Sequence, residues 1–385
     1  MTGLARTLEI LDRLIAFETV SAAPNLGLID YAEGLLRAAG FDTTRLPDAT
    51  GTKAGLYAVT GPPGAGVLLS SHTDVVPAAG QEWTRDPFRL TLEDARAYGR
   101  GTTDMKGFLA CILALAEQAG RTRLREPLKI VLSYDEEVGC IGIRDMLDRL
   151  LPMIGRPRAC IVGEPTGMQV AVGHKGKVAL RATCHGQGGH SALAPRFVNA
   201  LHLAADFIVK LRGLQEELAR DGARDEAYGV PFSTVHVGRL QGGTALNIVP
   251  DRAEIDVEFR HLAADAPGEI LAALGREADR AAEPFRASFP DARIVLEEIS
   301  AYPGLDVGPD EQVVAWAGKL ARSPTPIKVA FGTEAGYFAA LGIPTVVCGP
   351  GDMEGQGHKP DEFISLAALA DCGAMMDRLL DDLRA

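Results

Sequence analysis

A chain of 385 residues, at an average of ~150 residues per domain, is expected to form two domains. Hydrophobic residues make up 46% of the chain and charged residues 23%, a composition that excludes a disordered protein. The 39 basic and 51 acidic residues give a net charge of −12, so we expect no nucleic-acid partner.

The N-terminal segment and the cysteines bear on where the protein works. Charged residues at Arg6, Glu9, Asp12 and Arg13 interrupt the first apolar positions, so we expect no signal peptide. No stretch approaches the ~18 consecutive apolar residues of a membrane helix, so we expect no membrane partner. The 6 cysteines are scattered without a C-x-x-C pair, which is typical of reduced cysteines in a cytoplasmic protein.

Four short apolar runs are predicted to be strands. They lack polar alternation, as strands buried on both faces of a mainly parallel sheet do. The runs span 64–72, 128–135, 158–164 and 343–349. Helical stretches such as 105–119 and 312–322 separate them, which indicates an α/β domain. The first three runs end in His, Asp or Glu, and in such sheets chemistry gathers beyond the carboxyl ends of the strands.

The middle of the chain follows a different pattern, with strands that alternate polar and apolar residues. The predicted order is strand 176–184, helix 197–217, strand 232–240, strand 252–260, helix 266–283 and strand 292–299. This order is that of a ferredoxin-like α+β module. We therefore predict a discontinuous α/β domain over residues 1–175 and 300–385, with an inserted domain over residues 176–299.

Histidines and carboxylates stand at the predicted strand ends and loops. They are His72, Asp74, Asp104, Glu136, Glu137, Glu164 and His358. Zinc accepts imidazole and carboxylate ligands, and two ions ~3.5–4 Å apart need a bridging carboxylate with about two further ligands each. Asp104 as the bridge, with His72, Glu137, Glu164 and His358, supplies that set. We therefore expect two divalent metal ions, zinc in first place, with cobalt or manganese as alternatives.

Two further carboxylates suit supporting roles. In an extended segment, Asp74 lies on the same face as His72, and a ligating histidine usually donates its other N–H to a carboxylate. Glu136 and Glu137 are neighbours whose side chains diverge, so Glu137 can hold a metal while Glu136 faces bound water as a general base. Either pair alone is more typical of a solvated loop, so this prediction depends on the complete set.

Six segments, in this order along nearly the whole chain, resemble the dinuclear-zinc aminoacylase, deacetylase and carboxypeptidase G family. They are Ser71-His-Thr-Asp-Val-Val-Pro77, Gly99-Arg-Gly-Thr-Thr-Asp-Met-Lys-Gly107, Asp135-Glu-Glu-Val-Gly139, Gly163-Glu-Pro-Thr166, Gly189-His-Ser191 and Gly357-His-Lys-Pro-Asp361. The resemblance implies a zinc-dependent exopeptidase-like catalytic domain, with a mainly parallel central sheet, that carries an inserted lid. In this family the lid also forms a homodimer, so we expect a second copy of the chain as a partner.

The resemblance also implies roles for the metal-site residues. His72, Asp104 and Glu164 would hold one ion, and Asp104, Glu137 and His358 the other. Glu136 matches the general base, and Asp74 matches the residue that orients a ligand. The peptide bond after the bridging aspartate, here Asp104–Met105, is commonly cis in the family.

Residues of the lid and of a later loop are implied to contact the substrate. His190 matches a histidine that stabilises the oxyanion in the partner subunit's site. Asn247 and Arg260 resemble residues that bind the substrate carboxylate, although Arg260 also suits a surface ion pair on a strand. Glu334, beside Thr333 in a Gly-rich loop, is our candidate partner for a cationic substrate amine; a solvated loop glutamate is the alternative.

Within the family, the segments around 163–168, 172–176, 332–336 and 348–363 are most similar to those of acetylornithine deacetylases. Thr103 and residues 351–357 depart from that pattern without touching a predicted ligand. The predicted reaction is therefore hydrolysis of N-acetyl-L-ornithine to L-ornithine and acetate, a step of arginine biosynthesis. A desuccinylase, a dipeptidase and a general N-acyl amino acid hydrolase remain open, and a non-catalytic amino-acid-binding relative is the distant alternative.

Overall fold

The computed structural model describes residues 3–385, which divide into two compact units. Unit 1 runs to His174 and resumes at Leu305, and unit 2 comprises Lys175–Gly304. The predicted insert ended at residue 299, but its last strand continues to Tyr302 before the chain returns to unit 1. Within residues 3–385, the structure contains no helix whose length and apolar character would suit a membrane span.

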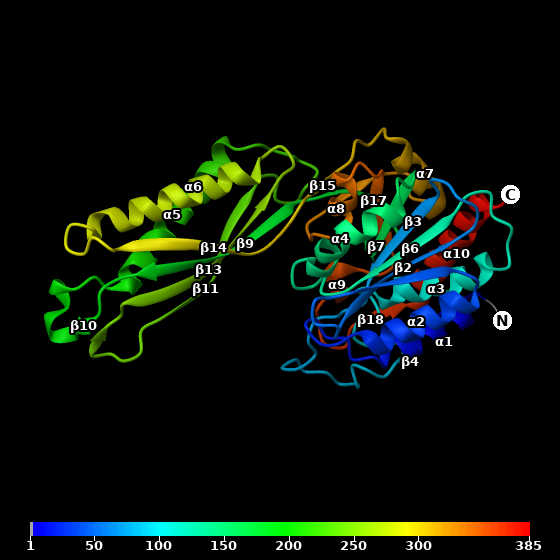
Figure 1. Ribbon diagram of the computed structural model, residues 1–385, viewed down its shortest axis with the longest axis horizontal. Helices are drawn as coiled ribbons and strands as arrows, with labels where there is room; N and C mark the ends of the chain where they lie inside the picture. The colour runs from blue at the N-terminus through cyan, green and yellow to red at the C-terminus, as the bar shows by residue number, and fades with distance from the viewer. Residues whose placement is uncertain (1–2) are drawn as a thin grey trace. The chain divides into compact units, whose positions relative to one another are not determined.

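Unit 1 is an α/β structure built on one large sheet (Figure 1). Its strands are β1 (Asp42–Pro47), β2 (Ala54–Thr60), β3 (Val67–His72), β6 (Leu128–Ser133), β7 (Ala159–Pro165), β8 (Ala171–His174), β15 (Leu305–Asp306), β16 (Ile327–Val329) and β17 (Thr345–Gly349). They follow the order β1-β2-β6-β3-β7-β17-β8-β15, with β16 also paired to β8. The four predicted strands are the neighbours β6, β3, β7 and β17, and all three pairs between them are parallel.

Every residue of β3, β6, β7 and β17 is buried, because helices cover both faces of the sheet. The helices of unit 1 are α1 (Gly3–Ile15), α2 (Leu26–Ala38), α3 (Lys106–Ala119), α4 (Ile141–Ile154), α7 (Gln312–Ala321), α8 (Ala335–Ala340), α9 (Met353–Gln356) and α10 (Leu366–Leu383). A small antiparallel sheet is formed by β4 (Thr91–Glu93), β5 (Arg96–Tyr98) and β18 (Phe363–Ser365). The predicted fold class, α/β with a mainly parallel centre, is confirmed.

Unit 2 has the predicted order of strands and helices. Its elements are β9 (Gly176–His185), β10 (Gly189–His190), the 3₁₀ helix η1 (Ser191–Arg196), α5 (Ala200–Asp221), β11 (Thr234–Gly242), β12 (Ile248–Val249), β13 (Arg252–His261), α6 (Pro267–Ala282), the 3₁₀ helix η2 (Glu283–Phe285) and β14 (Arg293–Tyr302). The antiparallel sheet runs β11-β13-β9-β14, which is the ferredoxin-like arrangement. Helices α5 and α6 cover one face of this sheet (Figure 1).

The limits of α5 show how a single side chain places a helix end. The predicted helix began at residue 197, but α5 begins at Ala200 because Asn199 caps it. The Asn199 side chain accepts a hydrogen bond from the Leu201 backbone N–H at 2.8 Å, which satisfies one of the first unpaired donors of the helix.

Candidate active site

The predicted metal ligands come from separate loops at the carboxyl edge of the unit 1 sheet. His72 is the last residue of β3, and Glu164 lies near the end of the neighbouring β7. Glu137 follows β6, while Asp104 precedes α3. His358 stands in the loop between α9 and β18. Adjacent parallel strands end at the same edge of a sheet, so the topology brings these residues together from distant parts of the chain.

Asp104 lies between the two histidines. Its Oδ1 is 3.1 Å from His72 Nε2, and its Oδ2 is 3.2 Å from His358 Nε2. His358 Nε2 is also 3.0 Å from Glu137 Oε2, and His72 Nε2 is 3.7 Å from Glu164 Oε1. One carboxylate that offers a different oxygen to each of two imidazoles has the arrangement expected of a residue that bridges two metal ions.

The donor set of this cluster fits divalent cations. Ligand atoms of His72, Glu136 and Glu164 lie within 4.8 Å of one another, and so do those of His72, Asp104 and Glu137. Within residues 3–385, the ion pairs of the carboxylates in this cluster are made with His72 and His358. Four ionised carboxylates outnumber the two imidazoles even when both rings are protonated, and metal ions would offset this excess of negative charge.

The pKa shifts in the cluster have the same origin. Burial and the charge of Asp104 raise the pKa of Glu137 to about 7. Burial and the same neighbouring charge raise the pKa of Glu164. Burial alone would also raise the pKa of Asp104, but hydrogen bonds from His358 and His72 outweigh it and hold that pKa below its ordinary range. A bound cation would favour the ionised form of every one of these carboxylates.

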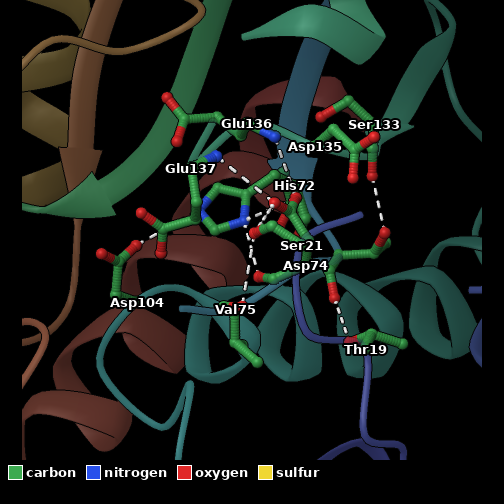
Figure 2. A network of polar contacts seen from close by, with 12 residues as sticks. Thr19, Ser21, His72, Asp74, Val75, Asp104, Ser133, Asp135, Glu136 and Glu137 are labelled. Atoms are coloured by element: carbon green, nitrogen blue, oxygen red, sulfur yellow. Dashed lines mark hydrogen bonds and ion pairs between the residues drawn. The ribbon is translucent and has the colours of Figure 1, made fainter. Parts of the chain in front are cut away.

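Asp74 ties two ligand-bearing segments together (Figure 2). Its carboxylate accepts the backbone N–H of Glu136 at 3.0 Å and that of Glu137 at 3.3 Å. The hydroxyl of Ser21 donates to the same carboxylate at 2.7 Å. Asp74 follows β3, so this carboxylate fixes the Glu136–Glu137 loop relative to the strand that ends in His72.

The orientation of His72 is set by its second ring nitrogen. Its Nδ1 lies 3.0 Å from the backbone oxygen of Asp74 and 3.5 Å from the Asp74 carboxylate. Both partners accept hydrogen bonds, so Nδ1 carries a proton, which leaves Nε2 as the ring atom that would bind a metal ion. The sequence predicted the carboxylate of Asp74 as this partner, and the structure places the main-chain oxygen closer.

Backbone geometry is unusual in the loops that carry predicted ligands. The peptide bond Asp104–Met105 is cis, as the resemblance implied. His358 has a φ of 61° and Asp135, next to Glu136, a φ of 53°. Residues other than glycine rarely adopt this left-handed region, and such conformations cluster at functional sites.

Residues 68–382 match peptidase family M20/M25/M40. The chain belongs to this family. It is 37% identical to the acetylornithine deacetylase of Myxococcus xanthus over 377 residues, which cover 96% of this chain and 95% of that protein. It is 36% identical to the acetylornithine deacetylase of Klebsiella pneumoniae (strain 342), over 93% of this chain and 92% of the relative.

Solved structures of two peptidases share the fold. The M20 family metallo-carboxypeptidase Sso-CP2 from Sulfolobus solfataricus aligns with a TM-score of 0.77 at 21% identity, over 97% of this chain and 98% of that one. Aminopeptidase PepT from Bacillus cereus aligns with a TM-score of 0.76 at 20% identity, over 99% and 98% of the two chains. Membership of the M20 family identifies this protein as a metal-dependent hydrolase.

The predicted general base of this M20 hydrolase lies beside the cluster. Figure 2 shows the side chains of Glu136 and Glu137 leaving the loop in different directions, with Glu137 turned toward Asp104. Glu136 is partly exposed, and its Oε1 lies 3.2 Å from the thiol of Cys140. Burial and the negative charge of Glu137 raise the pKa of Glu136. Sequence reasoning missed Cys140, because a thiol four residues beyond a glutamate carries no motif.

Thr333 and Glu334 are both buried within unit 1. The Thr333 hydroxyl accepts the Ala335 N–H at 3.0 Å and lies 3.1 Å from His174 Nε2. The Glu334 side chain accepts a hydrogen bond of 3.4 Å from Ser70, and burial raises its pKa to about 7. A glutamate that is 1% exposed is not the solvated loop residue considered above, and its contact with a substrate amine remains a prediction.

The three candidate residues of unit 2 are exposed or paired within that unit. The ring of His190 is exposed, and its Nδ1 accepts the Ala192 backbone N–H at 3.1 Å. Asn247 is exposed. Arg260 Nε donates to Glu258 at 3.1 Å, which is the strand ion pair weighed as its alternative role.

Another residue that sequence reasoning did not single out is Glu362, a carboxylate buried against the loop that carries Asp104. It lies one residue beyond the quoted segment Gly357–Asp361, four positions after His358. It stands in a polar stretch, after Lys359-Pro-Asp361, which gives no signal of burial, and its partners are remote in sequence.

Proposed function

We propose that this M20 hydrolase cleaves the amide bond of a small N-acylated amino acid, with N-acetyl-L-ornithine as the principal substrate. The position of Asp104 between His72 and His358 carries the proposal, because a bridging carboxylate suits two hydrolytic metal ions. The two acetylornithine deacetylases that match almost the full chain support the choice of substrate.

Five residues would hold the two ions. His72 and Glu164 would bind one ion, Glu137 and His358 the other, and Asp104 both. Bound divalent cations supply a Lewis acid for the acyl oxygen and lower the pKa of bound water toward ~7. Zinc is our first choice of ion, and cobalt or manganese would accept the same donors.

Glu136 would act as the general base. It lies beside the ligand cluster and is partly exposed, so its carboxylate can take a proton from the attacking water and return it to the leaving amine. Burial and the charge of Glu137 raise the pKa of Glu136, and bound cations would lower it again and favour the ionised form that accepts a proton.

His190 would stabilise the oxyanion of the tetrahedral intermediate. Because its Nδ1 accepts a backbone N–H, the neutral ring carries its proton on Nε2 and can donate a hydrogen bond from that atom.

We propose a homodimer formed through unit 2, in which His190 of the partner subunit would complete each active site. Unit 2 exposes many large apolar side chains that a second copy would cover. They are Leu193, Val209, Val230, Leu240, Leu246, Ile248, Leu271 and Ile299.

Asn247 and Arg260 would bind the α-carboxylate of the substrate. A guanidinium can form two parallel hydrogen bonds with a carboxylate, which makes Arg260 the stronger candidate. Its present partner Glu258 is shared with Lys177, 3.0 Å away, so Glu258 would keep a cationic partner if Arg260 turned to substrate.

A substrate panel tests this function directly. The panel comprises N-acetyl-L-ornithine, N-acetyl-L-methionine, N-succinyl-diaminopimelate and a dipeptide, each assayed on metal-free protein with and without added Zn²⁺ or Co²⁺. We expect the highest kcat/KM for N-acetyl-L-ornithine and no turnover without metal. A higher kcat/KM for the succinyl compound or the dipeptide would replace the proposed substrate. Sedimentation of the same samples tests the dimer.

A further inference from the structure

Glu362 is a fully buried carboxylate whose partners lie in the Asp104 loop. Its Oε1 accepts the backbone N–H of Thr103 at 2.8 Å and of Asp104 at 3.1 Å. Its Oε2 accepts the backbone N–H of Gly101 at 2.9 Å and pairs with Arg100 Nη1 at 2.8 Å. Both Glu362 and Arg100 are 1% exposed, so water does not compete for these hydrogen bonds.

The loop from residue 99 to residue 105 forms no helix or strand. Backbone N–H groups buried in such a loop need acceptors from elsewhere, and the Glu362 carboxylate serves three of them. One of the three is the N–H of Asp104 itself. The position of the bridging residue is therefore set by a side chain from a segment far along the sequence.

The same network extends to His358. Arg100 Nη1 donates to the backbone oxygen of Lys359 at 3.2 Å, and Arg100 Nη2 donates to the side chain of Gln81. The Gln81 amide in turn donates to the backbone oxygen of His358 at 2.9 Å. The backbone oxygens of His358 and Lys359 thus accept hydrogen bonds from Gln81 and Arg100, and Arg100 also pairs with the Glu362 carboxylate that binds the Asp104 loop.

We propose that Glu362, together with Arg100 and Gln81, positions Asp104 and His358 so that both reach the same metal pair. Neither ligand lies in a regular element, and the His358 side chain is 50% exposed, so its backbone needs an external restraint. Ligand atoms must lie within about 0.2 Å of their ideal distances for tight metal binding. The inference rests on the metal ligands proposed above, and it makes Glu362 a positioning residue that does not touch the ions.

A purely structural role for Glu362 is the competing explanation, because breaking a buried ion pair destabilises most proteins. Glu33 provides a matched control. It is also a buried carboxylate in unit 1, paired with Arg37 and Arg45, but none of its partners carries a proposed ligand. Glu33→Gln should lower stability without affecting the metal site, whereas Glu362→Gln should affect both.

The test measures Zn²⁺ affinity by competition with a chromophoric chelator, and the Tm of the metal-free protein, for the wild type and both variants. We expect Glu362→Gln to lower Zn²⁺ affinity about 10- to 100-fold, as the loss of partners around metal ligands typically does. Glu33→Gln should bind Zn²⁺ within about twofold of the wild type. Equal Zn²⁺ affinity for Glu362→Gln and the wild type would overturn the positioning role.

Two further variants separate the possible failures. If Glu362→Gln does not fold, Gln81→Ala decides, because Gln81 is partly exposed and its loss leaves the hydrogen bonds between Glu362 and the Asp104 loop in place. Gln81→Ala should weaken the affinity for one of the two Zn²⁺ ions several-fold, and unchanged affinity for both ions would reject the proposal.

Asp104→Asn tests the proposed ligands themselves. If this variant binds both ions normally, the proposed metal ligands are wrong. If it is the only variant that loses affinity, only the role of Glu362 is wrong.

Discussion

Units 1 and 2 differ in how deeply they bury clusters of charged residues. In unit 1, Asp104, Glu164 and His72 are buried together where neighbouring strands end. In unit 2, the buried core between the sheet and its two helices is apolar. Several charged side chains of its strands form partly exposed pairs, such as Arg181–Asp256 at 2.9 Å. Burying like charges lowers the stability of the fold unless a cation offsets them. Exposed ion pairs change the stability little. Buried carboxylates therefore point to chemistry more strongly than the number of charges does.

The largest effect that this contrast predicts is at Glu136. Glu136→Gln should retain both metal ions but lower kcat by about 10²–10⁴, because the amide cannot accept the proton of water. Metal analysis and steady-state kinetics on the same preparation check this. Asp256→Asn in unit 2 is the control and should leave kcat within about twofold. A Glu136→Gln enzyme with the wild-type rate would remove Glu136 from its role.

Asp74 should show the next largest effect. Asp74→Asn replaces one acceptor oxygen by a donor, so the N–H groups of Glu136 and Glu137 can no longer both be satisfied. We expect Zn²⁺ affinity or kcat/KM to fall about 10- to 100-fold. Chelator competition distinguishes the two outcomes. Unchanged affinity and activity would mean that the loop holds its shape without this carboxylate.

Glu334 tests whether a buried charge in unit 1 serves the substrate. Glu334→Gln should raise KM for N-acetyl-L-ornithine about tenfold, because the amide loses the negative charge that attracts the ammonium group. KM for N-acetyl-L-methionine should change little. An equal change for both substrates would make Glu334 a structural residue, consistent with its hydrogen bond to Ser70.

The smallest effect is expected for the exposed pairs of unit 2. The hydrogen bond from Arg181 lowers the pKa of Asp256, so its stabilising effect is present above the unfolded-state pKa of about 3.9 and is lost as the pH falls through the lower, folded-state pKa. Asp256→Asn should lower Tm by only about a degree or two at pH 7. Thermal melts from pH 7 to pH 2 should show this difference vanish. A large loss at neutral pH would contradict the contrast between the units.

The sequence was sufficient to predict the features that depend on local pattern. Apolar runs without alternation gave the four central strands, and the histidine and carboxylates that follow them meet at one edge because parallel strands end together. In the middle of the chain, the alternation of polar and apolar residues and the order of the elements predicted the antiparallel, ferredoxin-like unit. These predictions needed only the periodicity of side chains and the right order of elements.

The remaining features depend on contacts that no local pattern encodes. Glu362 binds the N–H of Thr103 across 259 sequence positions, and Gln81 reaches the backbone of His358 across 277. Strands β1 and β2 were not predicted either; β2 pairs antiparallel with β6, and β1 pairs antiparallel with β2 at the edge of the sheet. Arg260 pairs with Glu258, two positions before it on the same face of β13. The polar alternation places the two side chains on one face, but it does not predict which neighbour Arg260 binds.

The junction of the two units has a consequence for how such a protein can change over time. Strands β8 and β15 pair with His174 opposite Leu305, the residues at which the chain leaves unit 1 and returns to it. Paired Cα atoms in an antiparallel ladder are only about 5 Å apart, a gap that a tight turn also spans. Unit 2 is therefore inserted between two paired strands of unit 1. Exchanging or shortening unit 2 would leave the pairing of β8 with β15 unchanged. Lineages could thus change the length of unit 2 while inheriting the carboxyl edge of the unit 1 sheet intact.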